Sequence, residues 1–283
     1  MRSATAAGKP PAAQQVWKQL SAKRVINGTL VLAVGIGSVF VPPAFAALIL
    51  AISLIGLGEL AVLVRRSGGD LSVPVAGAAC AAYVIAPYFG LLNRFESLLV
   101  GATVVAAIVA ALGQGVNGFA YRAGMTVFAA LYLGKLLSYF VIVRQGHNGL
   151  ELAVWLVVII ALTDTVAMMI GMRFGRRPLA PRLSPAKTCE GAFAALLCAS
   201  AAGAAMSLLP HIAMSPWVGA LCGACVCGAA QVGDLAESAL KRNAGVKDSG
   251  QLIAGHGGVL DRFDSYIVAG AVGYAALRAA GLL

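Results

Sequence analysis

The chain has 283 residues, of which 60% are hydrophobic and 11% are charged, whereas soluble domains are about 45–50% apolar and about 25% charged. This balance excludes an ordinary soluble protein. The net charge of +10 is spread over several short segments without a nucleic-acid-binding motif. We therefore expect no nucleic-acid partner, and anionic lipid headgroups fit the charge better.

Nine stretches approach the about 20 apolar residues that a membrane-crossing helix needs. They cover residues 25–40, 44–64, 73–92, 97–112, 123–143, 150–172, 191–209, 216–232 and 263–283. Small residues are frequent in them, with Gly219 and Gly223 four positions apart, and small residues let membrane helices approach closely. We therefore expect an all-α integral membrane protein, a polytopic bundle of about nine transmembrane helices.

The basic residues orient this bundle. Lys and Arg near the ends of spans are retained on the cytoplasmic side, and most of the 21 basic residues fall on one side if the N-terminus is cytoplasmic. Residues 1–24 are polar and rich in Pro and Ala, without the apolar core of a signal peptide. We expect a cytoplasmic N-terminal tail over residues 1–24 and a polar cleft that faces the cytoplasm.

Acidic residues are rare, 11 in all, yet many of them lie between positions 234 and 264. The acidic members of this segment are Asp234, Glu237, Asp248, Asp261 and Asp264, and its basic members are Lys241, Arg242, Lys247, His256 and Arg262. Several glycines lie between them. Such a mixture suits the binding of phosphates and metal ions.

A helix that continues past Val232 would carry Asp234, Ser238 and Lys241 on one face, because they lie at i, i+4 and i+7. A carboxylate near the membrane boundary is costly unless it is paired or bound to a cation. Mg²⁺ takes a few carboxylates and completes its octahedron with substrate phosphates and water. Asp234 is therefore a candidate metal ligand.

A glycine turn, Gly257-Gly258, precedes the last predicted span. Glycines permit close backbone approach to a ligand, and helix N-termini present free N–H groups to anions. Asp261 and Asp264 follow on the first helical turn and would share a face. Asp234 and Asp261 would then be two separate carboxylate sites, which could hold two cations around a polyphosphate. The alternative is that Asp261 and Asp264 only cap a helix, but the combination of residues favours a functional site.

These residues resemble the C-terminal motif of the phosphatidate cytidylyltransferases, the CDP-diacylglycerol synthases. The motif reads Ser238-Ala239-Leu240-Lys241-Arg242, Lys247-Asp248 and His256-Gly257-Gly258-Val259-Leu260-Asp261-Arg262-Phe263-Asp264. A middle segment of the family is similar to Asp164-Thr165 and to the loop that holds Ser184-Pro185 and Lys187-Thr188-Cys189-Glu190-Gly191. The chain departs from the family pattern at Ala186, Cys189 and Ala254.

The resemblance implies a domain of N-terminal helices over 25–143 and a C-terminal catalytic membrane domain over 144–283. It implies transfer of the cytidylyl group of CTP to phosphatidate, giving CDP-diacylglycerol and pyrophosphate, with Mg²⁺, in a bacterial-type inner membrane and as a homodimer. The implied metal ligands are Asp234, Asp261 and Asp264, with Lys241 and Asp248 also catalytic. The implied substrate-binding residues are Ser238, Arg242, Lys247, His256, Gly257, Gly258, Arg262, Asp164, Ser184, Lys187 and Glu190.

Two intramembrane acids keep alternative interpretations. Asp164 is a functional-site hypothesis because charges within spans are expensive, but it could instead pair with Arg173 or Lys135. Glu59, in the second predicted span, is equally ambiguous. Two other functions stay open: a CTP-dependent lipid kinase, and a transporter of anionic metabolites with Asp164, Glu59 and Lys135 along its pathway.

Overall fold

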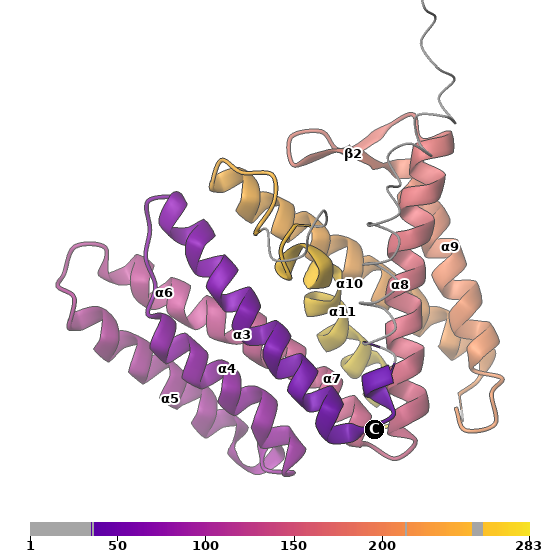
Figure 1. Cartoon of the computed structure of the whole chain (residues 1–283). Helices are drawn as coiled ribbons and strands as arrows, with labels where there is room; N and C mark the ends of the chain where they lie inside the picture. Colours follow the sequence, from indigo (N-terminus) through magenta and orange to yellow (C-terminus); the bar gives the residue numbers. More distant parts are fainter. Residues whose placement is uncertain (1–34, 36, 213, 251–256) are drawn as a thin grey trace, which may run out of the picture.

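The structure is a computed structural model, and it describes residues 35, 37–212, 214–250 and 257–283. Figure 1 shows a bundle of long helices with a small hairpin at one end. The helices are α3 (Pro42–Arg66), α4 (Val73–Tyr88), α5 (Leu92–Leu112), α6 (Phe119–Ala129), η1 (Ala130–Lys135), α7 (Leu136–Gln145), α8 (Gly149–Phe174), α9 (Cys189–Met206), α10 (Pro216–Asn243) and α11 (Leu260–Ala279). The strands are β1 (Pro178–Ala180) and β2 (Ser184–Thr188).

Six of the described helices are long and apolar enough to cross a membrane. They are Pro42–Arg66, Phe95–Leu112, Phe119–Gln145, Gly149–Phe174, Cys189–Met206 and Pro216–Asn243. This confirms the prediction of a helical integral membrane protein. The count of nine spans stays a prediction, since most of the first predicted span and the whole tail 1–24 lie outside the described residues.

A short hairpin interrupts the helical pattern between α8 and α9. Strands β1 and β2 are antiparallel, with Pro178 opposite Thr188 and Ala180 opposite Ser184. Hydropathy predicted only a loop here, because the strands are short and alternate weakly. The hairpin leads directly into α9, whose first turn is capped by Thr188: its Oγ1 accepts a hydrogen bond of 3.2 Å from the Gly191 N–H, satisfying a free helix-end donor.

Helices α9 and α10 approach each other through small residues. A Cβ atom on Gly219 or Gly223 would collide with the backbone of α9, at Gly203 and Ala199 respectively. The expectation that these two glycines let helices pack closely is thus confirmed. Gly233 makes a similar contact between α10 and α11, since a Cβ there would meet the Asp264 carbonyl oxygen. Helix α10 is therefore held tightly on two sides.

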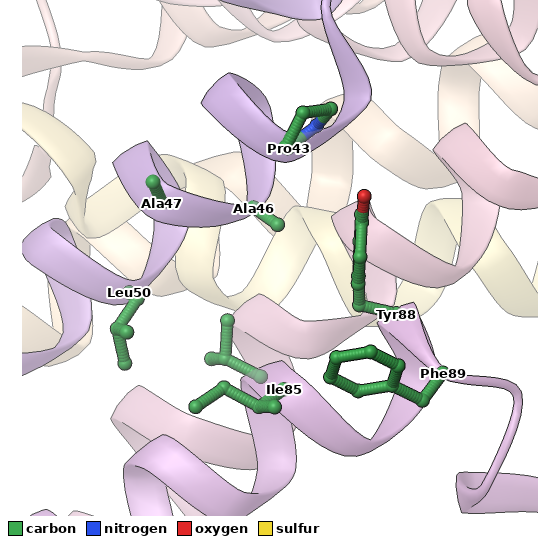
Figure 2. A pocket seen from close by; sticks show the side chains of 8 residues that line it. Pro43, Ala46, Ala47, Leu50, Ile85, Tyr88 and Phe89 are labelled. Atoms are coloured by element: carbon green, nitrogen blue, oxygen red, sulfur yellow. The ribbon is translucent and has the colours of Figure 1, made fainter.

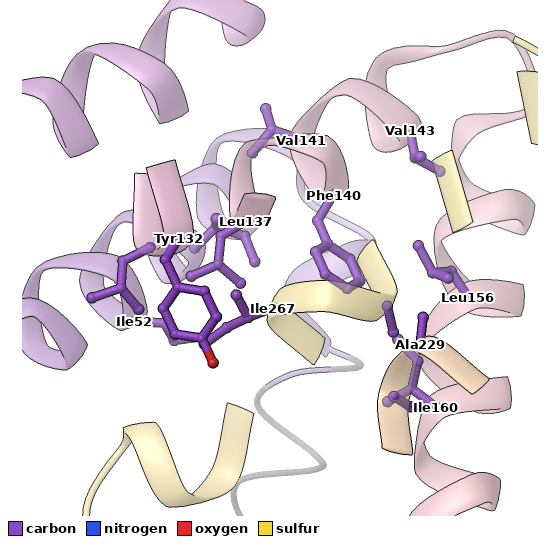
Figure 3. Packing of buried hydrophobic residues seen from close by; sticks show 14 of the residues in the cluster. Ile52, Tyr132, Leu137, Phe140, Val141, Val143, Leu156, Ile160, Ala229 and Ile267 are labelled. Atoms are coloured by element: carbon purple, nitrogen blue, oxygen red, sulfur yellow. The ribbon is translucent and has the colours of Figure 1, made fainter. Parts of the chain in front are cut away.

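The apolar core lies among α7, α8, α11 and the helices beside them. Figure 3 shows Phe140 of α7, Leu156 of α8 and Ile267 of α11 in this cluster, and each is at most 1% exposed. A π-helical segment, η1, joins α6 to α7 within one continuous rod over Phe119–Gln145. Large apolar side chains such as Trp217 also cover the outside, as expected for a protein whose solvent is lipid.

Candidate functional site

Helix α10 runs to Asn243, well past Val232, and carries Asp234 and Glu237 in about its last three turns. Glu237 is completely buried and forms an ion pair with Lys241, one helical turn further on. The Lys241 Nζ also lies 2.7 Å from Asp261 Oδ1 on α11. Lys241 therefore bridges the two helices, and its positive charge offsets two carboxylates where water is scarce.

Asp261 is the centre of a hydrogen-bond network at the start of α11. Its Oδ2 accepts bonds of 2.9 Å from both N–H and Oγ of Ser249, and of 2.8 Å from the Gly258 N–H. Burial disfavours the charged carboxylate, but Lys241 and these donors outweigh burial and lower the pKa of Asp261 to about 2. Asp261 thus carries a full negative charge at neutral pH.

Gly257 is required by this arrangement. Its φ of +82° is a left-handed conformation that other residues rarely adopt, and a Cβ there would meet the Asp261 carboxylate. The neighbouring Gly258 is equally confined, because a Cβ there would meet Ser249 and the carboxylate of Glu59. The glycine turn therefore allows two carboxylates to approach the chain just before α11.

Glu59 of α3 reaches the same turn from the other half of the sequence. Its carboxylate accepts bonds of 2.9 Å from the Val259 N–H, 2.7 Å from the Leu260 N–H and 3.0 Å from Ser249 Oγ. Glu59 and Asp261 together thus take the N–H groups of residues 258–260. The sequence predicts that N–H groups of this helix end face an anionic ligand. Instead, these three are bonded to carboxylates of the chain.

The hairpin and α10 meet at Asp234. The Lys187 Nζ of β2 lies 2.5 Å from Asp234 Oδ2. About two turns further along α10, Arg242 donates from Nε to the Leu183 carbonyl oxygen at 3.2 Å. The two sequence segments with the family-like motifs are therefore in direct contact.

Asp164 of α8 meets α11 at Ser265, next to Asp264. Asp264 is buried, and its Oδ1 accepts a 2.7 Å bond from the Ser265 N–H. The Ser265 Oγ donates to Asp164 Oδ1 at 3.0 Å. Lys135, one suggested partner of Asp164, is instead 2.6 Å from Glu96. The structural pair of Asp164 with Lys135 is therefore not formed, and a functional role of Asp164 stays a prediction.

The remaining predicted residues surround this centre in different ways. Ser238 is buried on α10 and Ser184 begins β2, whereas Lys247, Asp248 and Arg262 are exposed. Glu190 accepts bonds from the Arg176 and Arg177 N–H groups at 3.0 and 3.2 Å, so its carboxylate holds the base of the hairpin. His256 lies outside the described residues.

No three Asp, Glu, His or Cys side chains in the described ranges are arranged to hold a metal ion by themselves. Mg²⁺ does not need such a set, because it usually binds one or two carboxylates and takes its other ligands from phosphates and water. Asp264 is buried, and Asp234, Glu237 and Asp164 are close enough to act on it electrostatically. This concentration of carboxylate oxygens fits a hard divalent cation.

An apolar hollow elsewhere in the bundle is separate from this centre. It lies between the first half of α3 and the end of α4, whereas Glu59 is near the other end of α3. Figure 2 shows its lining, formed by Pro43, Ala46, Ala47, Leu50, Val84, Ile85, Tyr88 and Phe89. None of these side chains is charged, so the hollow has no groups for binding polyphosphate.

Fold and site together define a polytopic membrane protein with a cluster of acids and lysines at one end of α10 and α11. The chain belongs to the cytidylyltransferase family, whose sequence model matches residues 22–280.

Named relatives agree with this family. A phosphatidate cytidylyltransferase of Staphylococcus epidermidis is 38% identical over 152 residues, which are 53% of this chain and 58% of the relative. That of Bacillus subtilis is 37% identical over 154 residues, 53% of this chain and 57% of the relative. That of Mycobacterium bovis is 27% identical over 264 residues, 87% of this chain and 86% of the relative. The chain thus spans less than two thirds of the staphylococcal and bacillar proteins and most of the mycobacterial one.

Parts of the site depend on contacts between residues far apart in sequence, and these parts could not be predicted. Sequence patterns give Glu237 no role beyond membership of the acidic segment, predict nothing for Ser249 and Ser265, and leave Glu59 ambiguous. The signals that could have found them are weak. A glutamate inside an apolar span needs a partner, which applies to Glu59, but the sequence does not identify that partner.

Proposed function

We propose that the chain transfers the cytidylyl group of CTP to phosphatidate, giving CDP-diacylglycerol and pyrophosphate. The observation that carries the proposal is the meeting of the two motif segments, with Lys187 on Asp234 and Lys241 on Asp261. Family membership over residues 22–280 and the relatives' names support the choice of substrates.

In this reaction a phosphate oxygen of phosphatidate attacks the α-phosphorus of CTP. A new phosphorus–oxygen bond forms there, the bond from the α-phosphorus to the bridging oxygen breaks, and pyrophosphate leaves with that electron pair. The substrate supplies the nucleophile, so the protein needs to position groups and neutralise charge. Lys187 would hold the lipid phosphate, and Lys241, Arg242, Lys247 and Arg262 would hold the phosphates of CTP.

Two cations, at least one of them Mg²⁺, would be held at two carboxylate sites, Asp234 and Asp261, with Asp264 and Asp248 as supporting ligands. When bound, they would supply charge neutralisation for the phosphates of CTP. Lys187 and Lys241 already lie beside these acids. When a cation binds the carboxylate in place of the lysine, that lysine can pair with a phosphate oxygen instead, so its charge stays paired. Ser238 and the Gly257-Gly258 turn would border the nucleotide, and Ser184, Glu190 and Asp164 the lipid.

The site would open to the cytoplasm, as the basic residues predict, in a bacterial-type inner membrane. Figure 1 shows β2 at the same end of the bundle as the end of α8 and the start of α9, and Lys187 joins that hairpin to α10. A homodimer, implied by the resemblance, stays a prediction.

The decisive experiment uses the full chain with Mg²⁺, phosphatidate and CTP labelled at the α-phosphorus. We expect the label to enter the lipid product. A second reaction with γ-labelled CTP separates the lipid kinase, which would place that label in the lipid. Label confined to water-soluble nucleotides in both reactions would reject both enzymes, and uptake of anionic metabolites by proteoliposomes would then support the transporter.

A further inference from the structure

Glu59 of α3 ties the N-terminal helices to the start of α11. Its carboxylate accepts hydrogen bonds from Ser249 Oγ and from the N–H groups of Val259 and Leu260. These donors come 190 to 201 positions later in the sequence. Helix α11 has no side-chain cap of its own at Val259. Glu59 therefore serves as the cap, supplied by another helix, at the positive end of the α11 dipole.

The chain is shaped around this carboxylate. Gly250 and Gly258 both lie so close to Glu59 that a Cβ on either would collide with its carboxylate oxygens. A carboxylate on a membrane helix is costly to keep unless its bonds are satisfied, and here three donors satisfy it. The close fit indicates a fixed position for Glu59 and for the turn that it holds.

Ser249 connects Glu59 to the proposed metal ligand. The Ser249 Oγ lies 3.0 Å from Glu59 Oε2 and 2.9 Å from Asp261 Oδ2. The Ser249 N–H bonds to the same Asp261 oxygen at 2.9 Å. A shift of Glu59 would thus move both the start of α11 and the loop that orients the Asp261 carboxylate.

We infer that Glu59 is a positioning residue for the nucleotide half of the site. It fixes the turn at Gly257-Gly258 and the orientation of Asp261, so that this carboxylate and Lys241 face CTP and its Mg²⁺ correctly. The inference rests on the proposed function. The lipid half depends on Lys187 of β2, whose bond goes to Asp234 of α10, and the Glu59 contacts do not include it.

The substitution Glu59→Gln keeps the size and removes the charge. We expect KM for CTP and the Mg²⁺ concentration for half-maximal rate to rise about tenfold each, corresponding to about one hydrogen bond to a charged group. KM for phosphatidate should change less than about twofold. Glu59→Asp, which keeps the charge but is one methylene shorter, should recover part of the loss.

Glu96→Gln is the matched control, because Glu96 is also a bonded glutamate on an apolar helix. It lies on α5 and pairs with Lys135. A merely structural role of Glu59 predicts that both glutamine variants lower thermal stability and leave KM for CTP unchanged. That result, or an equal rise in KM for both substrates in Glu59→Gln, would overturn the inference.

Hydrogen exchange separates failure of this inference from failure of the proposed function. In Glu59→Gln we expect faster exchange of the Val259 and Leu260 amides, measured without any turnover, and unchanged exchange in α9. Unchanged exchange at Val259 and Leu260 would disprove the anchoring itself. A wild-type protein without cytidylyl transfer would instead reject the proposed function, and with it the positioning role, even if the exchange result holds.

Discussion

Two groups of charges lie within this apolar bundle, and they are built differently. Lys135 and Glu96 form a simple pair, one base with one acid, with Nζ and Oε1 2.6 Å apart. Where α10 ends and α11 begins, by contrast, Lys187 and Lys241 lie among carboxylates from α8, α10 and α11. A balanced pair needs nothing further, whereas a carboxylate-rich cluster favours added cations. The comparison distinguishes a structural ion pair from a candidate reaction centre.

The strongest test of the carboxylate-rich cluster is Asp261→Asn. The neutral side chain removes a metal ligand and leaves Lys241 without one of its two acidic partners, so we expect cytidylyl transfer to fall more than about 100-fold. The rate is measured with α-labelled CTP after size-exclusion chromatography has verified folding. Asp70→Asn, in the exposed loop after α3, is the control. Near-normal Mg²⁺-dependent turnover in a folded Asp261→Asn protein would contradict the metal assignment.

Lys187→Ala tests whether the hairpin belongs to the centre. Loss of the partner of Asp234 should raise KM for phosphatidate about 20-fold, because truncating one member of a close charge pair costs about 2 kcal/mol or more. The exposed Arg182→Ala change in the same hairpin should leave KM within about twofold. An unchanged KM in Lys187→Ala would remove the hairpin from the proposed lipid site.

A pair of glycine substitutions examines the turn before α11. Gly257→Ala and Gly245→Ala both place a side chain at positive φ, but only at Gly257 would the Cβ meet the Asp261 carboxylate. Both variants should lose about 1 kcal/mol of stability to backbone strain. Turnover should fall about tenfold in Gly257→Ala and little in Gly245→Ala. Equal turnover in the two variants would show that contact with Asp261 is unimportant.

Lys135→Met breaks the simple pair. Thermal unfolding in detergent should begin about 2–4 °C lower, the shift that about 1 kcal/mol produces in a chain of this size, while kcat and both KM values change less than about twofold. A large loss of turnover at unchanged stability would make this pair part of the reaction centre, and the distinction between a structural pair and a reaction centre would then be wrong.

Most of the fold follows from hydropathy, because a bilayer demands long apolar helices. Eight predicted spans have a matching helix, although α10 continues well beyond residue 232. The hairpin was not predicted, because its two short strands depend on each other for their hydrogen bonds. The resemblance assigns Lys187 and Asp234 to one site, and the structure brings these two together.

The partners inside the site were harder to predict. Hydropathy and helical spacing describe single segments, and they indicate that Asp234 and Lys241 share a face of α10. They say nothing of which carboxylate Lys241 meets on α11, or that Glu59 reaches the Val259 and Leu260 amides. Such contacts depend on how helices far apart in sequence pack, which a single sequence does not specify.

The π-helical segment η1 has a consequence for the phase of the helix that follows it. A π-turn accommodates one residue more than an α-turn, so η1 absorbs the rotation of about 100° that one extra residue would impose on α7 in an uninterrupted α-helix. Phe140 therefore keeps the orientation in which it packs against Gly270 of α11. The rod can thus lose one residue within Ala130–Lys135 and continue as an α-helix in the same phase, whereas a one-residue deletion on α7 between η1 and Phe140 would change which face of the rod meets α11.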